Sequence, residues 1–155
     1  MLSAGHCSSL QNYNGSNILT NLGSYYGASG DIRVFQVASG HTVSKTFRAS
    51  SFTDIRTQTA PATPPVNGTI CKTGMTTGYS CSTVAKVGVT VTYRDGTTVG
   101  NLIKSSSKIM DFGDSGAPAY FGSTPYGITS AFSDSNTYFS NFSKMLSALR
   151  TSVYT

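Results

Sequence analysis

The sequence lacks tryptophan altogether and has little charge, since charged residues make up 11% of its 155 positions. Its 11 lysines and arginines outnumber its 6 acidic residues and give a formal net charge of +5, but they are scattered and form no basic run or basic helix. No stretch reaches the length of a transmembrane helix, and residues 1–5 have no basic and apolar segments of a signal peptide. We therefore expect neither a nucleic-acid partner nor a membrane partner.

The residues that are abundant favour strands and turns. The chain has 16 glycines, 9 tyrosines and 8 phenylalanines, and it is rich in serine and threonine. This composition is typical of a β-rich extracellular domain with short strands and many turns, and less of a helical cytosolic one. A chain of this length forms one moderate core or two small ones.

Several segments have the alternation of a half-buried strand. The clearest is a hairpin in which Val87, Val89 and Val91 alternate with small or polar residues, Arg94-Asp95-Gly96 makes the turn, and Thr98 to Ile103 returns. Further strands are predicted at residues 31–38, 42–48, 117–121 and 125–131. Residues 8–30 are interpreted as loop with one short strand. The Pro-rich segment 58–66 is the best candidate linker between two lobes, and Phe142, Met145, Leu146 and Leu149 predict a short closing helix.

The stretch Asp111-Phe-Gly-Asp-Ser-Gly-Ala-Pro118 has the composition of a tight loop with an exposed backbone. Gly113 tolerates dihedrals that a side chain forbids, and successive N–H groups in such a loop can converge on one anion. A nucleophilic serine needs these donors for the oxyanion formed by its attack, here the N–H groups of Gly113 and Ser115. An ordinary polar turn is the alternative interpretation.

The three cysteines suggest a local disulfide. Nine residues lie between Cys71 and Cys81, and glycines at 74 and 78 allow the chain to loop back. Closing this loop would contribute about 2–3 kcal/mol in the chain-entropy model. A zinc site is a poor alternative because neither a Cys-x-x-Cys pair nor a nearby histidine is present. Cys7 is either a buried free thiol, a residue whose partner lies outside this sequence, or a cysteine nucleophile.

Four motifs in order resemble the chymotrypsin-fold serine proteases, most closely the streptogrisin and α-lytic branch. They are Ser3-Ala-Gly-His-Cys7, Cys71-Lys-Thr-Gly-Met-Thr-Thr-Gly-Tyr-Ser-Cys81, Gly113-Asp-Ser-Gly-Ala-Pro118 and Gly127-Ile-Thr-Ser130. The resemblance implies an all-β fold of two antiparallel barrels. Residues 1–60 would form a partial N-terminal barrel that lacks the family's first strands, and residues 61–155 a C-terminal barrel with the closing helix. In the family, the cysteine after the histidine pairs with one in that first segment.

The resemblance also implies a role for each site residue. His6 would be the general base and acid, Asp31 the carboxylate that orients it, and Ser115 the nucleophile, with Gly113 and Ser115 as the oxyanion hole. Asp54 is the rival for the aspartate, and His41 is interpreted as an exposed loop residue. Ser130 resembles the serine that begins the substrate-binding strand.

Asp114 needs a positive partner, because a buried unpaired carboxylate is costly. In the streptogrisin branch a basic residue directly after the first cysteine of the Cys-x₉-Cys block provides it, and Lys72 stands at this position. We therefore predict an internal Lys72–Asp114 pair. A lysine offers a point charge where the more usual arginine offers a bidentate fork.

The sequence departs from the family in two places near the serine. No cysteine precedes the loop at Ile109-Met110-Asp111, so the family's second disulfide is absent, and Asp111 is expected to face solvent. Ala131 and Phe132 follow Ser130 where the family has small glycines. A phenylalanine at this wall would narrow the pocket toward small side chains, or block peptides.

The sequence thus predicts a secreted, monomeric serine endopeptidase that acts through an acyl-enzyme, uses no metal or cofactor, and binds peptide substrates and protein inhibitors. A catalytically impaired pseudoprotease that serves as a binding module is the alternative. A third possibility, an unrelated β-sandwich or lectin-like domain, predicts that His6, Asp31 and Ser115 do not converge.

Overall fold

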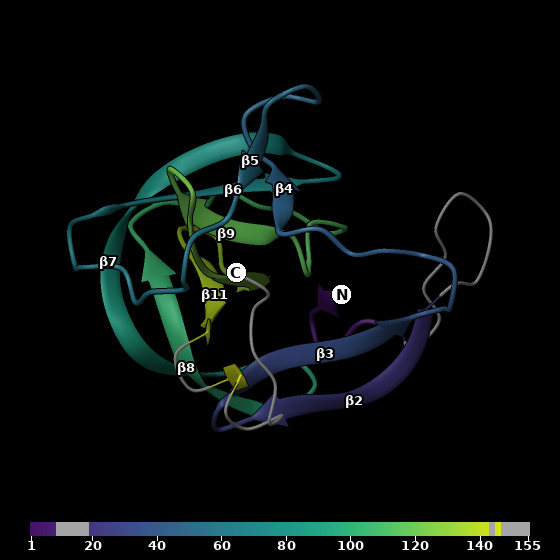
Figure 1. The fold of residues 1–155 in the computed structure, drawn as a ribbon. Coiled ribbons are helices and arrows are strands. Elements are labelled where there is room, and N and C mark those ends of the chain that lie inside the picture. Colours follow the sequence, from purple (N-terminus) through teal and green to yellow (C-terminus); the bar gives the residue numbers. More distant parts are fainter. Residues whose placement is uncertain (9–18, 143–144, 147–155) are drawn as a thin grey trace.

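Nearly all of the regular secondary structure is β-strand in a computed structural model that describes residues 1–8, 19–142 and 145–146 (Figure 1). None of the described segments is a helix long and apolar enough to cross a bilayer. The described strands are β1 (Leu2–Ser3), β2 (Leu19–Gly27), β3 (Gly30–Val37), β4 (Thr46–Arg48), β5 (Ile55–Thr57), β6 (Thr69–Gly74), β7 (Gly78–Thr92), β8 (Thr98–Ser105), β9 (Pro118–Phe121), β10 (Thr124–Phe132) and β11 (Thr137–Asn141).

The second half of the chain forms a closed antiparallel barrel in the order β10-β11-β8-β7-β6-β9. The predicted hairpin is its longest pair, β7 with β8, and β7 curves around the barrel in Figure 1. Apolar side chains fill the interior because strand residues point alternately to the two faces. The fully buried members of this core are Ile70, Val84, Ile103, Ala119 and Phe139.

The first half forms two small sheets and, within the described residues, no closed barrel. One sheet has the order β1-β3-β2 and the other pairs β4 with β5. The long β2–β3 hairpin runs along one side of the barrel in Figure 1. The expected all-β fold is therefore confirmed.

Apolar packing and hydrogen bonds join the two halves. Ile32 on β3 packs in one cluster with Ile128 on β10 and with Met145. The N–H of Asp31 donates to Ser140 Oγ at 2.9 Å. These contacts fix the position of β3 relative to the barrel. The two halves contribute different residues to the site, so its geometry depends on them.

Three details differ from the sequence-based expectations. The strand expected at 42–48 is confined to β4, and β2 is nine residues long where mostly loop was expected. The candidate linker 58–66 contains no strand and lies between β5 and β6, and it is held to the barrel because Thr59 N donates to Ser123 O and Ala62 N to Pro125 O. The closing helix is not borne out. Its predicted residue Leu149 lies outside the described residues, and helical backbone is described only at positions 142, 145 and 146.

Candidate functional site

Three residues that are far apart in the sequence meet in a cleft between the two halves. His6 follows β1, Asp31 is the second residue of β3, and Ser115 lies in the loop before β9. His6 Nδ1 is 2.6 Å from Asp31 Oδ2, and His6 Nε2 is 3.0 Å from Ser115 Oγ. The imidazole thus connects a carboxylate to a hydroxyl through its two nitrogens, an arrangement that can move a proton away from the hydroxyl.

Strand pairing places the histidine beside the aspartate. Ser3 on β1 pairs with Arg33 on β3, so the turn that follows β1 returns along the start of β3. The N–H of His6 then donates to Asp31 Oδ1 at 2.9 Å. Gly5 permits this approach because a Cβ at this position would come within 2.9 Å of Asp31 Oδ1 and would collide with the carbonyl of Tyr25.

Asp31 is fully buried, and its negative charge acts on the imidazole. The hydrogen bond to Asp31 is the main cause that raises the pKa of His6 above its ordinary value. A contact between His6 Nε2 and Cys7 Sγ at 3.9 Å raises this pKa further, while burial opposes the shift. His6 therefore holds its proton more tightly than a free histidine, and the fraction that can act as a base grows as the pH rises.

The loop around Ser115 presents two backbone donors beside the hydroxyl. Gly113 and Gly116 have φ values of 94° and 83°, which favour glycine. The N–H groups of Asp114, Gly116 and Ala117 are used within the fold, on carbonyls at 2.9–3.1 Å. Within the described residues the N–H groups of Gly113 and Ser115 have no acceptor. These two free donors are available to an oxyanion on an atom attacked by Ser115.

The buried carboxylate of Asp114 anchors this loop to the protein interior. Lys72, also fully buried, places its Nζ 3.3 Å from Asp114 Oδ2, so the expected ion pair is present. Burial alone would raise the pKa of Asp114, but the hydrogen bonds from Thr77 Oγ1 and from backbone N–H groups lower it to about 2. Gly74 is required beside this carboxylate because any Cβ there would collide with the Asp114 side chain.

Next to Ser115 lies a cleft of about 590 Å³ with a largely apolar and aromatic lining. Ser130, Ala131 and Phe132 all line it, as expected for the wall of a substrate pocket. The ring of Phe132 meets Phe112 edge-on with centroids 5.1 Å apart, and Lys108 Nζ lies 4.2 Å from its centre. Phe132 is thereby held at the wall by contacts on two sides.

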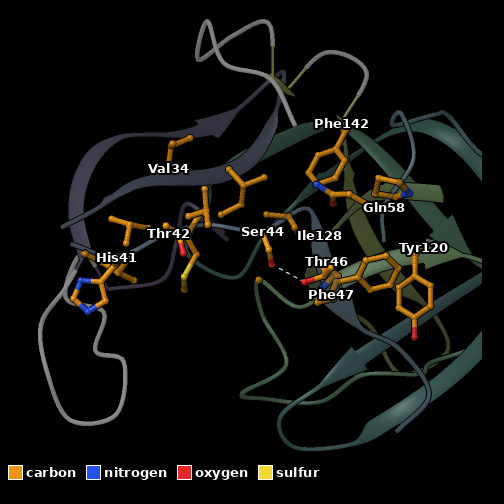
Figure 2. Close-up of a pocket in the computed structure, with 18 of the residues that line it drawn as sticks. Val34, His41, Thr42, Ser44, Thr46, Phe47, Gln58, Tyr120, Ile128 and Phe142 are labelled. Carbon is orange, nitrogen blue, oxygen red and sulfur yellow. Dashed lines mark hydrogen bonds between the residues drawn. The ribbon is translucent and has the colours of Figure 1, made fainter. Parts of the chain in front are cut away.

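A second and larger hollow of about 810 Å³ is lined by Gly116 but not by Ser115 (Figure 2). Figure 2 shows Val34, Ile128 and Phe142 around it, with His41 at its other end. His41 is exposed, as expected. None of the site residues His6, Asp31 and Ser115 belongs to its lining.

No family model matches the sequence, but one curated protein and several solved structures do. Streptogrisin-C of Streptomyces griseus is 34% identical over 88 residues, which is 54% of this chain and only 19% of that protein's length. Protease A of Thermobifida fusca is 28% identical with a TM-score of 0.82, covering 99% of this chain and 83% of that one. A glutamic-acid-specific serine protease is 27% identical with a TM-score of 0.86 over 99% of this chain and 85% of that one. The chymotrypsin of Cellulomonas bogoriensis is 25% identical with a TM-score of 0.83, at 99% and 85% coverage.

The chain thus resembles the chymotrypsin-fold serine proteases of the streptogrisin and α-lytic branch in both sequence and fold. Its expected Cys71–Cys81 disulfide is present and joins β6 to β7 at directly paired positions. Asp54, the rival for the aspartate, lies instead in the β4–β5 hairpin, where it pairs with Arg56 at 2.8 Å. Cys7 carries no disulfide and is half-buried.

Two features of the site were not foreseen from the sequence. Thr77 donates to Asp114 Oδ2 at 2.5 Å and so shares the anchoring of the serine loop with Lys72. Tyr93 places its hydroxyl 2.6 Å from Ser130 Oγ at the base of the cleft. The Gly-rich turn that brings Thr77 back toward Lys72 was visible in the sequence, whereas nothing in the pattern around Tyr93 indicated that it points inward. Among the described residues no cluster of three or more histidine, cysteine or acidic side chains could hold a metal ion.

Proposed function

We propose that the protein is a serine endopeptidase that hydrolyses peptide bonds through an acyl-enzyme on Ser115. One observation carries the proposal: His6 Nε2 lies 3.0 Å from Ser115 Oγ while Asp31 holds the opposite nitrogen at 2.6 Å. Both distances are within the range required of a nucleophile, its base and the group that orients the base. The kinship with named serine proteases supports the same conclusion.

In the proposed first stage His6 removes the proton of Ser115 as Oγ attacks the carbonyl carbon of the peptide. The negative charge moves to the carbonyl oxygen and is received by the N–H groups of Gly113 and Ser115. Asp31 stabilises the resulting imidazolium. Collapse of the intermediate breaks the C–N bond, and His6 returns the proton to the leaving amine.

In the second stage water takes the place of the amine. His6 removes a proton from the water as it attacks the ester carbonyl, and the same two N–H groups receive the oxyanion. Collapse then releases the carboxylic acid and returns the proton to Ser115 Oγ. Side chains, backbone donors and water account for every proton and electron pair in both stages.

The substrates we propose are proteins or peptides bound along the cleft wall of Ser130, Ala131 and Phe132, with protein inhibitors able to occupy the same cleft. We also propose that the enzyme acts outside the cell as a monomer. The Cys71–Cys81 disulfide supports an extracellular setting, because such bonds persist in oxidising compartments.

A second candidate function is a binding module that has lost turnover. It is favoured by Phe132, which stands at the cleft wall against Phe112, and by the first half, which within the described residues does not close into a barrel. A module of this kind would bind peptides in the cleft without cleaving them.

Labelling with a fluorophosphonate tests the proposal, because this probe requires an activated serine and an oxyanion hole but little pocket. We expect the wild-type chain to be labelled and Ser115→Ala and His6→Ala to lose labelling. Ser44→Ala and His41→Ala, exposed residues outside the site, are the matched controls and should be labelled like wild type. If the folded wild-type chain is not labelled, the enzyme proposal is wrong, and peptide binding without cleavage would support the binding module.

A further inference from the structure

A short chain of hydroxyl groups leads from Tyr93 to the buried carboxylate of the site. Tyr93 follows β7 in the tight turn before β8, where its N–H donates to Thr97 O at 2.8 Å. Its hydroxyl lies 2.6 Å from Ser130 Oγ, and Ser130 Oγ in turn donates to Asp31 Oδ2. Asp31 belongs to the first half and the two hydroxyl groups to the barrel, so this relay, defined as Tyr93–Ser130–Asp31, spans the cleft.

The number of hydrogens fixes the direction of each bond in the relay. The carboxylate of Asp31 can only accept, and the hydroxyl of Ser130 has a single hydrogen to give. Since that hydrogen goes to Asp31, the bond between Tyr93 and Ser130 must be donated by the phenol. Burial raises the pKa of Tyr93 above its ordinary value, which keeps the phenol neutral and able to donate.

Asp31 depends on donors of this kind because it is fully buried. Among the described residues no lysine or arginine forms an ion pair with it. Its charge is stabilised by His6, through the ring and the backbone N–H, and by Ser130. A hydroxyl that accepts a hydrogen bond becomes a stronger donor, so donation by Tyr93 strengthens the bond from Ser130 to Asp31.

We propose that Tyr93 is a positioning residue of the active site. Its phenol holds the Ser130 hydroxyl in the orientation that donates to Asp31, and this bond fixes the carboxylate against His6 Nδ1. The effect on catalysis rests on the proposed function, but the relay is present without substrate and can be measured without turnover. Besides His6 and Cys7, the titratable groups beside the relay are Tyr26 and Asp95, and the Tyr26 hydroxyl donates to Asp95 Oδ2 at 3.0 Å.

The test is Tyr93→Phe, which removes the hydroxyl and keeps the ring. We expect kcat to fall about 3–10-fold, the effect of one hydrogen bond, with KM changed less than about twofold. Without the Tyr93 hydroxyl, the hydrogen bond from Ser130 to Asp31 is weaker, so the negative charge of Asp31 stabilises the His6 imidazolium more strongly. The pKa of His6, followed by NMR titration with His41 as internal reference, should therefore rise by about a few tenths of a unit.

Tyr120→Phe is the matched control, because Tyr120 also bonds a hydroxyl, Thr73 Oγ1 at 2.7 Å, but lies outside the site. It should leave kcat and the His6 titration as in wild type, even where it lowers stability. A double-mutant cycle adds a second test: on a Ser130→Ala background, Tyr93→Phe should have no further effect on kcat or on the His6 pKa.

The outcomes separate the positioning role from the proposed function. If Tyr93→Phe titrates and turns over like Tyr120→Phe, or if its effect adds fully to that of Ser130→Ala, the positioning role is wrong and the protease stands. If the wild-type chain does not cleave peptides, the proposed function is wrong. The His6 titration of Tyr93→Phe against Tyr120→Phe then still decides whether the relay acts on the histidine.

Discussion

At the scale of single residues, the buried Lys72–Asp114 pair anchors the serine loop to β6. Both side chains are fully buried, and Lys72 Nζ also donates to Gly78 O at 2.7 Å. Lys72→Met would leave the Asp114 charge buried without a cation, so we expect it to destabilise the protein by about 3–5 kcal/mol in urea unfolding. Lys108→Met, which breaks the exposed pair with Asp111, should cost less than about 1 kcal/mol. Equal losses in the two variants would contradict a structural role for the buried pair.

The raised pKa of His6 predicts how activity depends on pH. In the proposed mechanism Ser115 is activated only while His6 is unprotonated, and the hydrogen bond to Asp31 shifts the loss of the His6 proton to higher pH. The acidic limb of kcat/KM should therefore have an apparent pKa above about 6.5, the ordinary value of histidine. The contribution of the His6–Asp31 ion pair to the stability of the fold has the opposite pH dependence. This contribution is complete below about pH 6.5 and is lost as the pH rises through the raised pKa of His6. A peptide-cleavage profile with its acidic limb below pH 6 would contradict this assignment.

The sequence predicts residues well where a motif fixes both type and spacing. His6, Asp31 and Ser115 were proposed from three short motifs, and these residues lie together in the cleft. Tyr93 could not be proposed in this way, because its role depends on how the β7–β8 turn packs against the end of β10, where Ser130 lies, and a tyrosine beside a turn is common on surfaces.

At the scale of elements, strand β6 supports the serine loop in two ways. Lys72 pairs with Asp114, and Gly74, which has no side chain, leaves room for the Asp114 carboxyl group. A Cβ at Gly74 would collide with the carboxyl group of Asp114. Gly74→Ala should therefore displace the loop and slow fluorophosphonate labelling of Ser115 by about tenfold or more, with some loss of stability. Gly27→Ala is the control, because a Cβ there would meet only ordinary contacts at 3.6 Å and beyond. Labelling of Gly74→Ala at the wild-type rate would show that the loop does not depend on this contact.

A strong alternation of apolar and polar residues predicts a β-strand, and a weak alternation does not. The β7–β8 hairpin follows from the valines at 87, 89 and 91, which are half-buried while the residues between them are exposed. Strand β2 was largely missed because most of its residues are exposed or only half-buried, and it gains its order from pairing with β3 along its whole length. The apolar spacing at residues 142–149 correctly predicts that Phe142, Met145 and Leu146 are buried. Helical backbone is described only at positions 142, 145 and 146.

At the scale of the whole molecule, the site exists only while the two halves keep their relative position. In the proposed mechanism the first half supplies the base and its carboxylate, and the barrel supplies the nucleophile, the oxyanion donors and the relay. The apolar cluster of Ile32, Ile128 and Met145 crosses between the halves, and Ile32 directly follows Asp31 in the sequence. Packing in this cluster should therefore control catalysis as well as stability.

Two identical substitutions separate these effects. Ile32 in the cluster between the halves and Ile70 in the barrel core are both fully buried, so Ile32→Ala and Ile70→Ala should each cost about 2–5 kcal/mol. At a temperature where both variants remain folded, only Ile32→Ala should slow fluorophosphonate labelling of Ser115, by about tenfold or more, because a cavity beside Asp31 lets β3 shift against the barrel. Equal labelling rates would mean that hydrogen bonds such as Asp31 N to Ser140 Oγ hold the halves in register without this packing.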